Sequence, residues 1–299
     1  MRRFLWLMLV LFATPIVLLA QEECQKLTHE ALEAYGCLDS MKNYPAQLQA
    51  QLGAQVGHDT SMSESEKARF SETIMKNISA DQLIKMVEAT MSANCKPAEL
   101  KKVLAEIKTP LVQKMRAFED APNTPAGAEK LRTYMESAAA KNVTPERKKL
   151  IDEMLAASNS TEALVDVIVE TSRGMLEGMG APAASPEQVT EMRKRVSANA
   201  GQQMKDTMLA VYRDASDAEL EKYIAIQNEP AFRDFNLSFR KALANGMGAE
   251  ARTTGIALKA LLEQITAERK KAEEQKPAPA ATPAAPSTAT PAPSPTTPK

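Results

Sequence analysis

Aromatic side chains are scarce in this chain of 299 residues, where phenylalanine, tyrosine and tryptophan together make up 4%. Because β-strands are enriched in aromatic and β-branched residues, so small a share disfavours a protein built from sheets. Hydrophobic residues nevertheless account for 44% of the chain. Alanine, leucine, isoleucine, valine and methionine must therefore build the core, and this composition predicts an all-α fold.

The chain also lacks an excess of charge of either sign. It has 37 Lys+Arg against 38 Asp+Glu, which gives a formal net charge of −1. A nucleic-acid-binding protein usually carries a basic patch or stripe, and an acidic interaction tail shows the opposite bias. We therefore expect no nucleic-acid partner.

Catalytic motifs are missing as well. The chain has no Gly-x-Ser-x-Gly elbow and no glycine-rich phosphate loop, and its two histidines are His29 and His58. His29 and Glu33 lie one helical turn apart, as two metal ligands on one face would, but no third ligand follows at a metal-site spacing. A solvated helix face is the favoured interpretation. We predict no catalytic residue, no cofactor, no metal site and no enzymatic activity.

The N-terminus has the order of a signal peptide. Two arginines precede an apolar run over residues 4–19, and Ala20 follows directly before the polar Gln21. A membrane-spanning helix needs about 20 apolar residues, so an uncleaved anchor is the less favoured alternative. We expect cleavage after residue 20, export to the periplasm of a bacterium, and no stable membrane span in the mature chain.

Three cysteines remain after this cleavage, namely Cys24, Cys37 and Cys95. In an oxidising compartment they allow one disulfide and one leftover thiol. If residues 25–36 form one helix, Cys24 and Cys37 are about 20 Å apart, beyond the roughly 7 Å that a bridge allows between Cα atoms. Cys37 and Cys95 both lie at predicted helix ends, so we predict a Cys37–Cys95 disulfide with Cys24 as the leftover thiol.

Apolar residues recur at helical spacing, most clearly over residues 98–115. Helix starts are marked by predicted capping boxes and by prolines suited to a first turn. The boxes are Ser63 with Glu66, Ser79 with Gln82, and Ser216 with Glu219, and the prolines are Pro97, Pro145 and Pro186. We therefore expect many short helices.

The chain resembles itself at a spacing of 120 residues. Residues 98–110 align with residues 218–230, and six of these 13 positions are identical. Proline ends both segments, so we expect a break at Pro110 and Pro230, with Thr109 capping the helix that follows Pro110. A period this long exceeds that of a solenoid repeat and indicates two related helical bundles in tandem.

The predicted organisation follows from this repeat. A first helical repeat covers residues 21–120 and a second covers residues 146–250, with a partly helical connection between them. A C-terminal helix over residues 251–275 precedes a tail of residues 276–299, which holds eight of the chain's 18 prolines. That composition predicts a disordered tail.

One stretch is similar to a known family. Its residues are Val211, Tyr212, the run from Ser216 to Leu220, Ile224, Glu229, Pro230 and Phe232. They resemble the core signature of the domain of unknown function 2059 family, whose members are exported helical bacterial proteins. The resemblance implies a helical fold and export, and it implies no chemistry.

Methionine is common, and two pairs at one-turn spacing are Met175 with Met179 and Met204 with Met208. Thioethers can bind Cu(I), but methionine more often fills cores or lines adaptable surfaces. We interpret the chain as an exported non-enzymatic protein, a periplasmic binding or structural component. The alternative is a carrier of small apolar or lipid-like ligands in a methionine-rich groove, so the expected partner is an unidentified protein or an apolar ligand.

Overall fold

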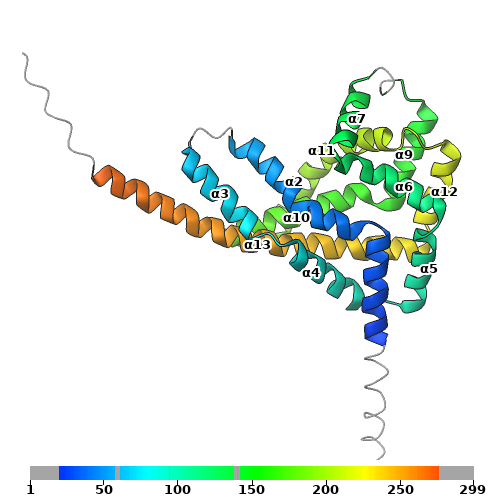
Figure 1. Cartoon of the computed structure of the whole chain (residues 1–299), viewed down its shortest axis with the longest axis horizontal. Coiled ribbons are helices and arrows are strands. Elements are labelled where there is room, and N and C mark those ends of the chain that lie inside the picture. Colours follow the sequence, from blue (N-terminus) through cyan, green and yellow to red (C-terminus); the bar gives the residue numbers. More distant parts are fainter. Residues whose placement is uncertain (1–19, 58–60, 94, 138–139, 141, 276–299) are drawn as a thin grey trace, which may run out of the picture. The chain divides into compact units, whose positions relative to one another are not determined.

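The computed structural model describes residues 20–57, 61–93, 95–137, 140 and 142–275. Every regular element of these described residues is a helix (Figure 1), which confirms the predicted all-α fold. The first has residues 20–34 as its described part, and the others are α2 (Cys37–Gly57), α3 (Glu64–Lys76), α4 (Ala80–Ala93), α5 (Pro97–Ile107), α6 (Pro110–Asp120), η1 (Ala121–Asn123), α7 (Pro125–Glu136), α9 (Pro145–Ser158), α10 (Ser160–Gly178), α11 (Pro186–Val211), α12 (Asp217–Gln227) and α13 (Pro230–Glu274).

Residues up to Leu261 form one compact unit, and residues from Leu262 belong to a second. The C-terminal helix predicted for residues 251–275 is the later part of the longer α13. Residues 1–19 of the predicted signal peptide, which spans residues 1–20, lie outside the described residues, as does the predicted tail of residues 276–299. Within the described part of the chain, no helix is both long and apolar enough to cross a membrane.

Two helix ends depend on a residue with a left-handed backbone. Gly36 has φ +74° and separates the first helix from α2, and Asn159 has φ 52° and separates α9 from α10. Glycine adopts this region without strain, and asparagine tolerates it better than most residues do. Each residue allows a sharp turn, so the two following helices leave in a new direction.

Two of the predicted capping boxes are complete, those of Ser63 with Glu66 and of Ser216 with Glu219. The third forms only in part. Ser79 Oγ accepts the backbone N–H of Gln82 at 3.2 Å, but the backbone N–H of Ser79 donates to Glu250 of α13. A carboxylate from a distant helix therefore takes the place that the sequence pattern assigns to Gln82.

Proline divides the long apolar pattern of residues 98–115 as predicted. Thr109 Oγ1 accepts the backbone N–H of Val112 at 3.4 Å, and Pro110 follows in the first turn of α6. Proline suits this position because its missing N–H would have no helical partner there. The break lets α6 leave the line of α5 and carry its own buried face.

The helix bounds agree at the spacing of 120 residues. α5 and α12 each have 11 residues, and the next helix begins with Pro110 or Pro230. Leu100 and Leu220 are both buried at matching positions. The starts differ, because α12 has a capping box whereas Lys96, the N-cap of α5, makes no side-chain cap bond. The duplication itself stays a prediction.

The hydrophobic cores do not follow the two predicted repeats. The larger cluster combines side chains of the first repeat with the start of α13, including Leu32, Val87, Ile107, Phe232 and Met247. The second combines α6 with α9, α11 and α12, including Val112, Met115, Ile151, Leu220 and Tyr223. The two halves therefore share their cores, which differs from the two separate bundles that we expected.

The disulfide differs from the predicted one. Cys24 in the first helix is bonded to Cys95, with a Cα–Cα distance of 5.9 Å, and Cys37 is a buried free thiol. The predicted Cys37–Cys95 pair is therefore wrong, as is Cys24 as the leftover thiol. The start of the first helix, with Cys24, lies next to the segment that follows α4, which contains Cys95. Cys37 is the first residue of α2 and is buried in the larger core.

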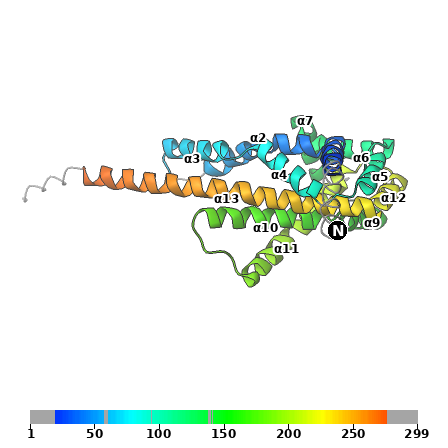
Figure 2. The same cartoon turned by 90° about the horizontal axis from the view of Figure 1, so that it is seen from below.

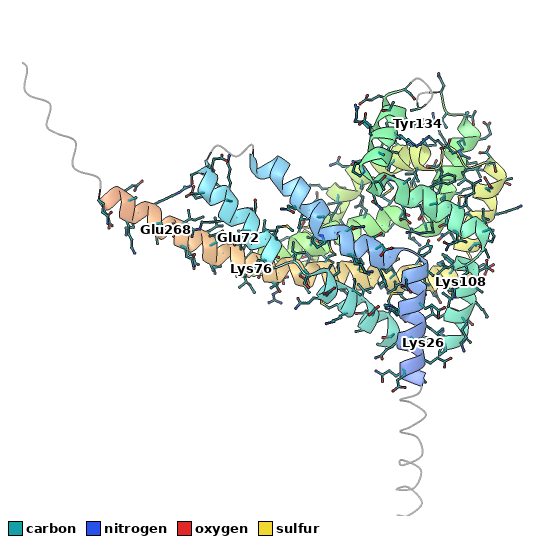
Figure 3. The ribbon with its side chains drawn as sticks, in the orientation of Figure 1. Lys26, Glu72, Lys76, Lys108, Tyr134 and Glu268 are labelled. Atoms are coloured by element: carbon teal, nitrogen blue, oxygen red, sulfur yellow. A yellow bond between two sulfur atoms is a disulfide. The ribbon has the colours of Figure 1, made fainter. Side chains whose placement is uncertain are left out.

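Ion pairs also join the first helix to α5. Lys108, the C-cap of α5 labelled in Figure 3, donates to Glu30 at 2.7 Å. Its hydrogen bond and its charge lower the pKa of Glu30. Lys101 pairs with Glu23 at 2.7 Å. Such exposed pairs contribute little to stability, so the disulfide and the apolar contacts are the stronger links.

Glycines let α10 approach α13 closely, and Figure 2 shows the two helices side by side. A Cβ added to Gly174 would lie 2.0 Å from the carbonyl oxygen of Gly248, and one added to Gly255 would lie 2.5 Å from that of Met175. Any larger residue at these positions would push the backbones apart. This close contact holds the adjoining part of α10 against the site described next.

Candidate functional site

A carboxylate, Glu119 near the end of α6, lies where α6, α11 and α12 meet. Its Oε1 accepts hydrogen bonds from the hydroxyl groups of Tyr212 at 2.5 Å and Tyr223 at 3.1 Å. Its Oε2 accepts a hydrogen bond from Arg116 Nη1 at 2.6 Å. Both tyrosines are fully or almost fully buried. Because both carboxylate oxygens are engaged, Glu119 connects the three helices and is not a free base.

Tyr35 extends this network into the turn after the first helix. Its hydroxyl lies 3.3 Å from that of Tyr223 and accepts a hydrogen bond from Gln227 Nε2 at 3.2 Å. Gln227 Oε1 in turn accepts from Asn236 Nδ2 at 2.6 Å. Gln227 is fully buried, so these bonds satisfy a side chain that would otherwise be costly to bury.

Arg116 is the cation of the network. Its guanidinium lies 4.7 Å from the centre of the Tyr35 ring, and its Nη2 donates to Asp120 at 2.9 Å. Burial alone would lower the pKa of Arg116, but the negative charges of Glu119 and Asp120 oppose this effect, and the pKa is raised. Arg116 therefore keeps its charge and holds the turn at Tyr35 against α6.

Burial raises the pKa of Tyr35, Tyr212 and Tyr223, and the negative charge of Glu119 adds to the increase for each. All three hydroxyl groups are therefore protonated at neutral pH. They serve as hydrogen-bond donors to the carboxylate and to one another. The network is thus a fixed set of paired polar groups inside an apolar surrounding.

Two cavities border on the network and share four lining residues, which are Tyr35, Val167, Phe239 and Leu243. The first has a volume of about 250 Å³ and is also lined by Glu119, Ser158, Asn236 and Arg240. The second has a volume of about 320 Å³, and most of its other lining residues are apolar, including Met41, Leu83 and Met247. The two cavities are therefore adjacent. The first has the larger share of polar side chains, and the second is mostly apolar but also has Arg116 and Ser40 in its lining.

The polar cavity has a cationic side. Arg240 Nε lies 2.8 Å from Asp166 Oδ2, and Arg193 Nη1 lies 2.5 Å from Asp166 Oδ1. Two guanidinium groups thus share one carboxylate, which leaves an excess of one positive charge. Arg240 is the member of this group that lines the cavity.

The sequence-predicted residues lie elsewhere or have other partners. His29 Nδ1 lies 2.6 Å from Glu88 Oε1, and His58 lies outside the described residues. Cys37 lines the apolar cavity, and burial raises the pKa of its thiol to about 12. Of the noted methionines, Met208 lines the polar cavity.

Sequence reasoning missed the tyrosine network. A usable signal was present, because three of the chain's only five tyrosines, Tyr35, Tyr212 and Tyr223, meet in it. In a chain so poor in aromatic residues, each tyrosine is a candidate for a specific hydrogen bond. Their convergence depends on contacts between residues up to 188 positions apart, which no local pattern reveals.

Comparison with known proteins finds no matching family model, no matching curated protein and no matching solved structure. The resemblance to the exported family stays a prediction. The site itself is therefore the basis for an inference about function.

Proposed function

We propose that this chain is an exported, non-enzymatic binding protein that holds a small amphipathic acid, a molecule with an apolar body and one carboxylate. The observation that carries the proposal is the adjacency of two cavities with different linings. One is lined mostly by apolar surface, since its cation, Arg116, is already paired with Glu119 and Asp120, and the other presents Arg240. This makes the carrier interpretation more specific than the broader one of a binding or structural component.

The apolar cavity suits the body of such a ligand. Methionine and leucine side chains form much of its wall, among them Met41, Leu243 and Met247. Ligand pockets typically measure about 300–1,000 Å³, and the two adjacent cavities together fall within this range. Methionine adapts its shape to different apolar chains, which suits a carrier with relaxed selectivity for the body of its ligand.

The polar cavity suits the head. Arg240 presents a guanidinium, the group that binds carboxylates best because its N–H donors match the two oxygens. The excess positive charge of Arg193, Asp166 and Arg240 would be neutralised by one ligand carboxylate. Asn236 and Ser158 line the same cavity and can add hydrogen bonds.

Binding without catalysis is supported by the state of Glu119. A general base must be free to take a proton, whereas Glu119 accepts hydrogen bonds from Arg116, Tyr212 and Tyr223. Export is supported by the Cys24–Cys95 disulfide, since such bonds persist in oxidising compartments. The periplasm remains part of the proposal.

The test is calorimetric titration of the full chain with straight-chain alkanoates of increasing length and with the matching alcohols. We expect alkanoates to bind more tightly as the chain lengthens, until the cavities are filled. Val167→Phe should block both cavities and weaken binding at least tenfold. Ile168→Phe is the matched control, because Ile168 is the exposed neighbour of Val167.

The head group is tested separately. Arg240→Gln should remove most of the preference for the alkanoate over the alcohol, whereas Arg233→Gln, an exposed position on the same helix, should leave it unchanged. If no alkanoate binds, or if Val167→Phe has no effect on binding, the carrier proposal is wrong. A protein partner or a structural role would then be the remaining interpretation.

A further inference from the structure

A third cavity, separate from the two described above, lies between the first helix, α5 and α13. Its volume is about 210 Å³, and it shares no lining residue with the other two cavities. Apolar side chains from α4, α5 and α13 form much of its wall, among them Met91, Leu100, Val103 and Phe235. Its size, below that of a typical drug-sized ligand pocket, restricts it to a small ligand.

One buried hydroxyl in this wall has no partner. Thr28 lines the cavity and is fully buried, and its Oγ1 makes no hydrogen bond to any residue that the structure describes. Buried polar groups are nearly always hydrogen-bonded, and leaving one unpaired is unfavourable. A ligand atom in the cavity can supply the missing bond.

A positive group and two negative groups line the same cavity. Lys96 is the N-cap of α5 and makes no side-chain cap bond, so the N–H groups that follow Pro97 in the first turn of α5 receive no acceptor from the N-cap side chain. A helix N-terminus of this kind, next to a lysine, attracts a carboxylate. Glu99 and Asp234 line the cavity as well and can pair with an ammonium group.

The charged groups of Lys96, Asp234 and Glu99 are available to a ligand. Lys96 and Asp234 are exposed, and neither forms an ion pair with another residue in the described ranges. In the part of the chain that the structure describes, the ion-pair partner of Glu99 is Lys102 on its own helix, at 3.1 Å. The Cys24–Cys95 disulfide holds this end of the cavity together, since Cys95 is part of its lining.

We propose that this cavity binds a free α-amino acid with an apolar side chain. The carboxylate of the ligand lies at Lys96 and the start of α5, and its ammonium group lies between Glu99 and Asp234. The apolar side chain contacts Leu100 and Phe235, and the Thr28 hydroxyl donates to the ligand carboxylate. One small molecule thus satisfies both signs of charge and the unpaired hydroxyl.

The test uses isothermal titration of the oxidised full chain with L-leucine and L-methionine. Leucinamide and N-acetyl-L-leucine are the comparison ligands, because the first lacks the carboxylate and the second lacks the ammonium group. We expect the free amino acids to bind, and each comparison ligand to bind at least tenfold more weakly. Equal binding of a comparison ligand would overturn the proposed pairing of the charge that it lacks.

Variants locate the site. Thr28→Val keeps the shape of the side chain and should weaken binding about five- to tenfold, as expected for one lost hydrogen bond. Thr171→Val is its matched control, because Thr171 Oγ1 is also buried without a partner among the described residues but lines none of the three cavities. Lys96→Met and Asp234→Asn should each weaken binding of L-leucine about tenfold.

The outcomes separate this proposal from the proposed function. Val167→Phe blocks only the other two cavities, so it should leave amino-acid binding unchanged. If L-leucine and L-methionine fail to bind at millimolar concentration, the proposal is wrong whatever the alkanoates do. If they bind but Thr28→Val and Thr171→Val behave alike, the assignment to this cavity is wrong.

Discussion

The backbone N–H of Ser79, at the start of α4, donates a 3.2 Å hydrogen bond to the carboxylate of Glu250 on α13. The two residues are 171 positions apart, so a helix of the first predicted repeat is capped by a side chain of the longest helix. Glu250 is only 7% exposed, and this burial raises the pKa of its carboxyl group. The hydrogen bond from Ser79 opposes the increase without cancelling it.

This relationship predicts a pH-dependent stability. Because the pKa of Glu250 is raised in the folded chain, its contribution to stability is fully present below the ordinary glutamate pKa of about 4.5. That contribution is lost as the pH rises through the folded-state pKa. Glu250→Gln removes the titration, so the stability of the variant relative to the natural chain should increase between pH 4 and pH 8.

Urea unfolding at several pH values measures this difference. Glu250→Ala is the control, because it also removes the acceptor for the Ser79 N–H and should cost about 1 kcal/mol as a lost helix cap. Glu250→Gln keeps an acceptor oxygen. A constant difference between Glu250→Gln and the natural chain across this pH range would contradict the prediction.

The second prediction concerns the disulfide. Cys24 and Cys95 are 71 positions apart, and closing a loop of this length stabilises a chain by about 4 kcal/mol in the chain-entropy description. Cys24→Ser and Cys95→Ser should each lower the free energy of unfolding by about this amount. Mass mapping of the oxidised chain should recover a Cys24–Cys95 peptide pair. A Cys37–Cys95 pair would show that the described connection is wrong.

Cys37 should be protected in the native chain. It is 5% exposed, and its pKa of about 12 leaves almost no thiolate at pH 8. Since the thiolate is the reactive form, iodoacetamide at pH 8 should label Cys37 only after unfolding. Rapid labelling of the native chain, followed by mass spectrometry, would contradict its burial.

Local patterns predicted much of the fold. The helical spacing and the prolines predicted the separate helices α5 and α6, and the serine pattern predicted the capping box at Ser216. These features depend on residues within one or two helical turns of each other. The capping box predicted at Ser79 was wrong in one of its two hydrogen bonds. The backbone N–H of Ser79 donates to Glu250 of a distant helix and not to the side chain of Gln82.

Long-range partners could not be predicted in this way. The argument from helix length correctly separated Cys24 from Cys37, but it could not tell which of them lies near Cys95. The tyrosine network also depends on long-range contacts, since Tyr35 contacts Tyr223 only when the helices pack together. Packing geometry, which no single segment encodes, decides both.

Glu219 should make the chain sensitive to acid. The hydrogen bond from Lys114 and those within its capping box lower the pKa of Glu219 to about 2. Its contribution to stability is therefore present above the ordinary pKa of about 4.5 and is lost as the pH falls towards 2. Glu219→Gln should be less stable than the natural chain at pH 6, and this difference should shrink at pH 2.5.

Thermal unfolding at both pH values measures the effect. Glu99→Gln is the matched control, because Glu99 lies 120 positions earlier in α5 but belongs to no capping box. Lys114→Met should reproduce part of the Glu219→Gln effect, since it removes the 2.6 Å ion pair. If Glu219→Gln and the natural chain differ equally at both pH values, the lowered pKa is not the cause.

The last prediction tests the network around Glu119. Tyr212→Phe and Tyr223→Phe each remove one hydroxyl that donates to Glu119 Oε1 and leave the ring in place. Hydrogen bonds to a charged group contribute about 1.5–3 kcal/mol, so each variant should lose roughly that much stability in urea unfolding. Tyr134→Phe is the control, because Tyr134, labelled in Figure 3, interacts with Arg213 through its ring and should lose less than about 0.5 kcal/mol.

The double variant decides whether the two hydroxyl groups act together. Both donate to the same oxygen, so removing either one lets the other bind Glu119 more strongly, and the second loss leaves that oxygen without a tyrosine donor. The double variant of Tyr212 and Tyr223 should therefore lose at least about 0.5 kcal/mol more than the sum of the single variants. Strict additivity would mean that each hydroxyl stabilises Glu119 independently of the other, and single variants as stable as the natural chain would mean that the tyrosines merely pack beside it.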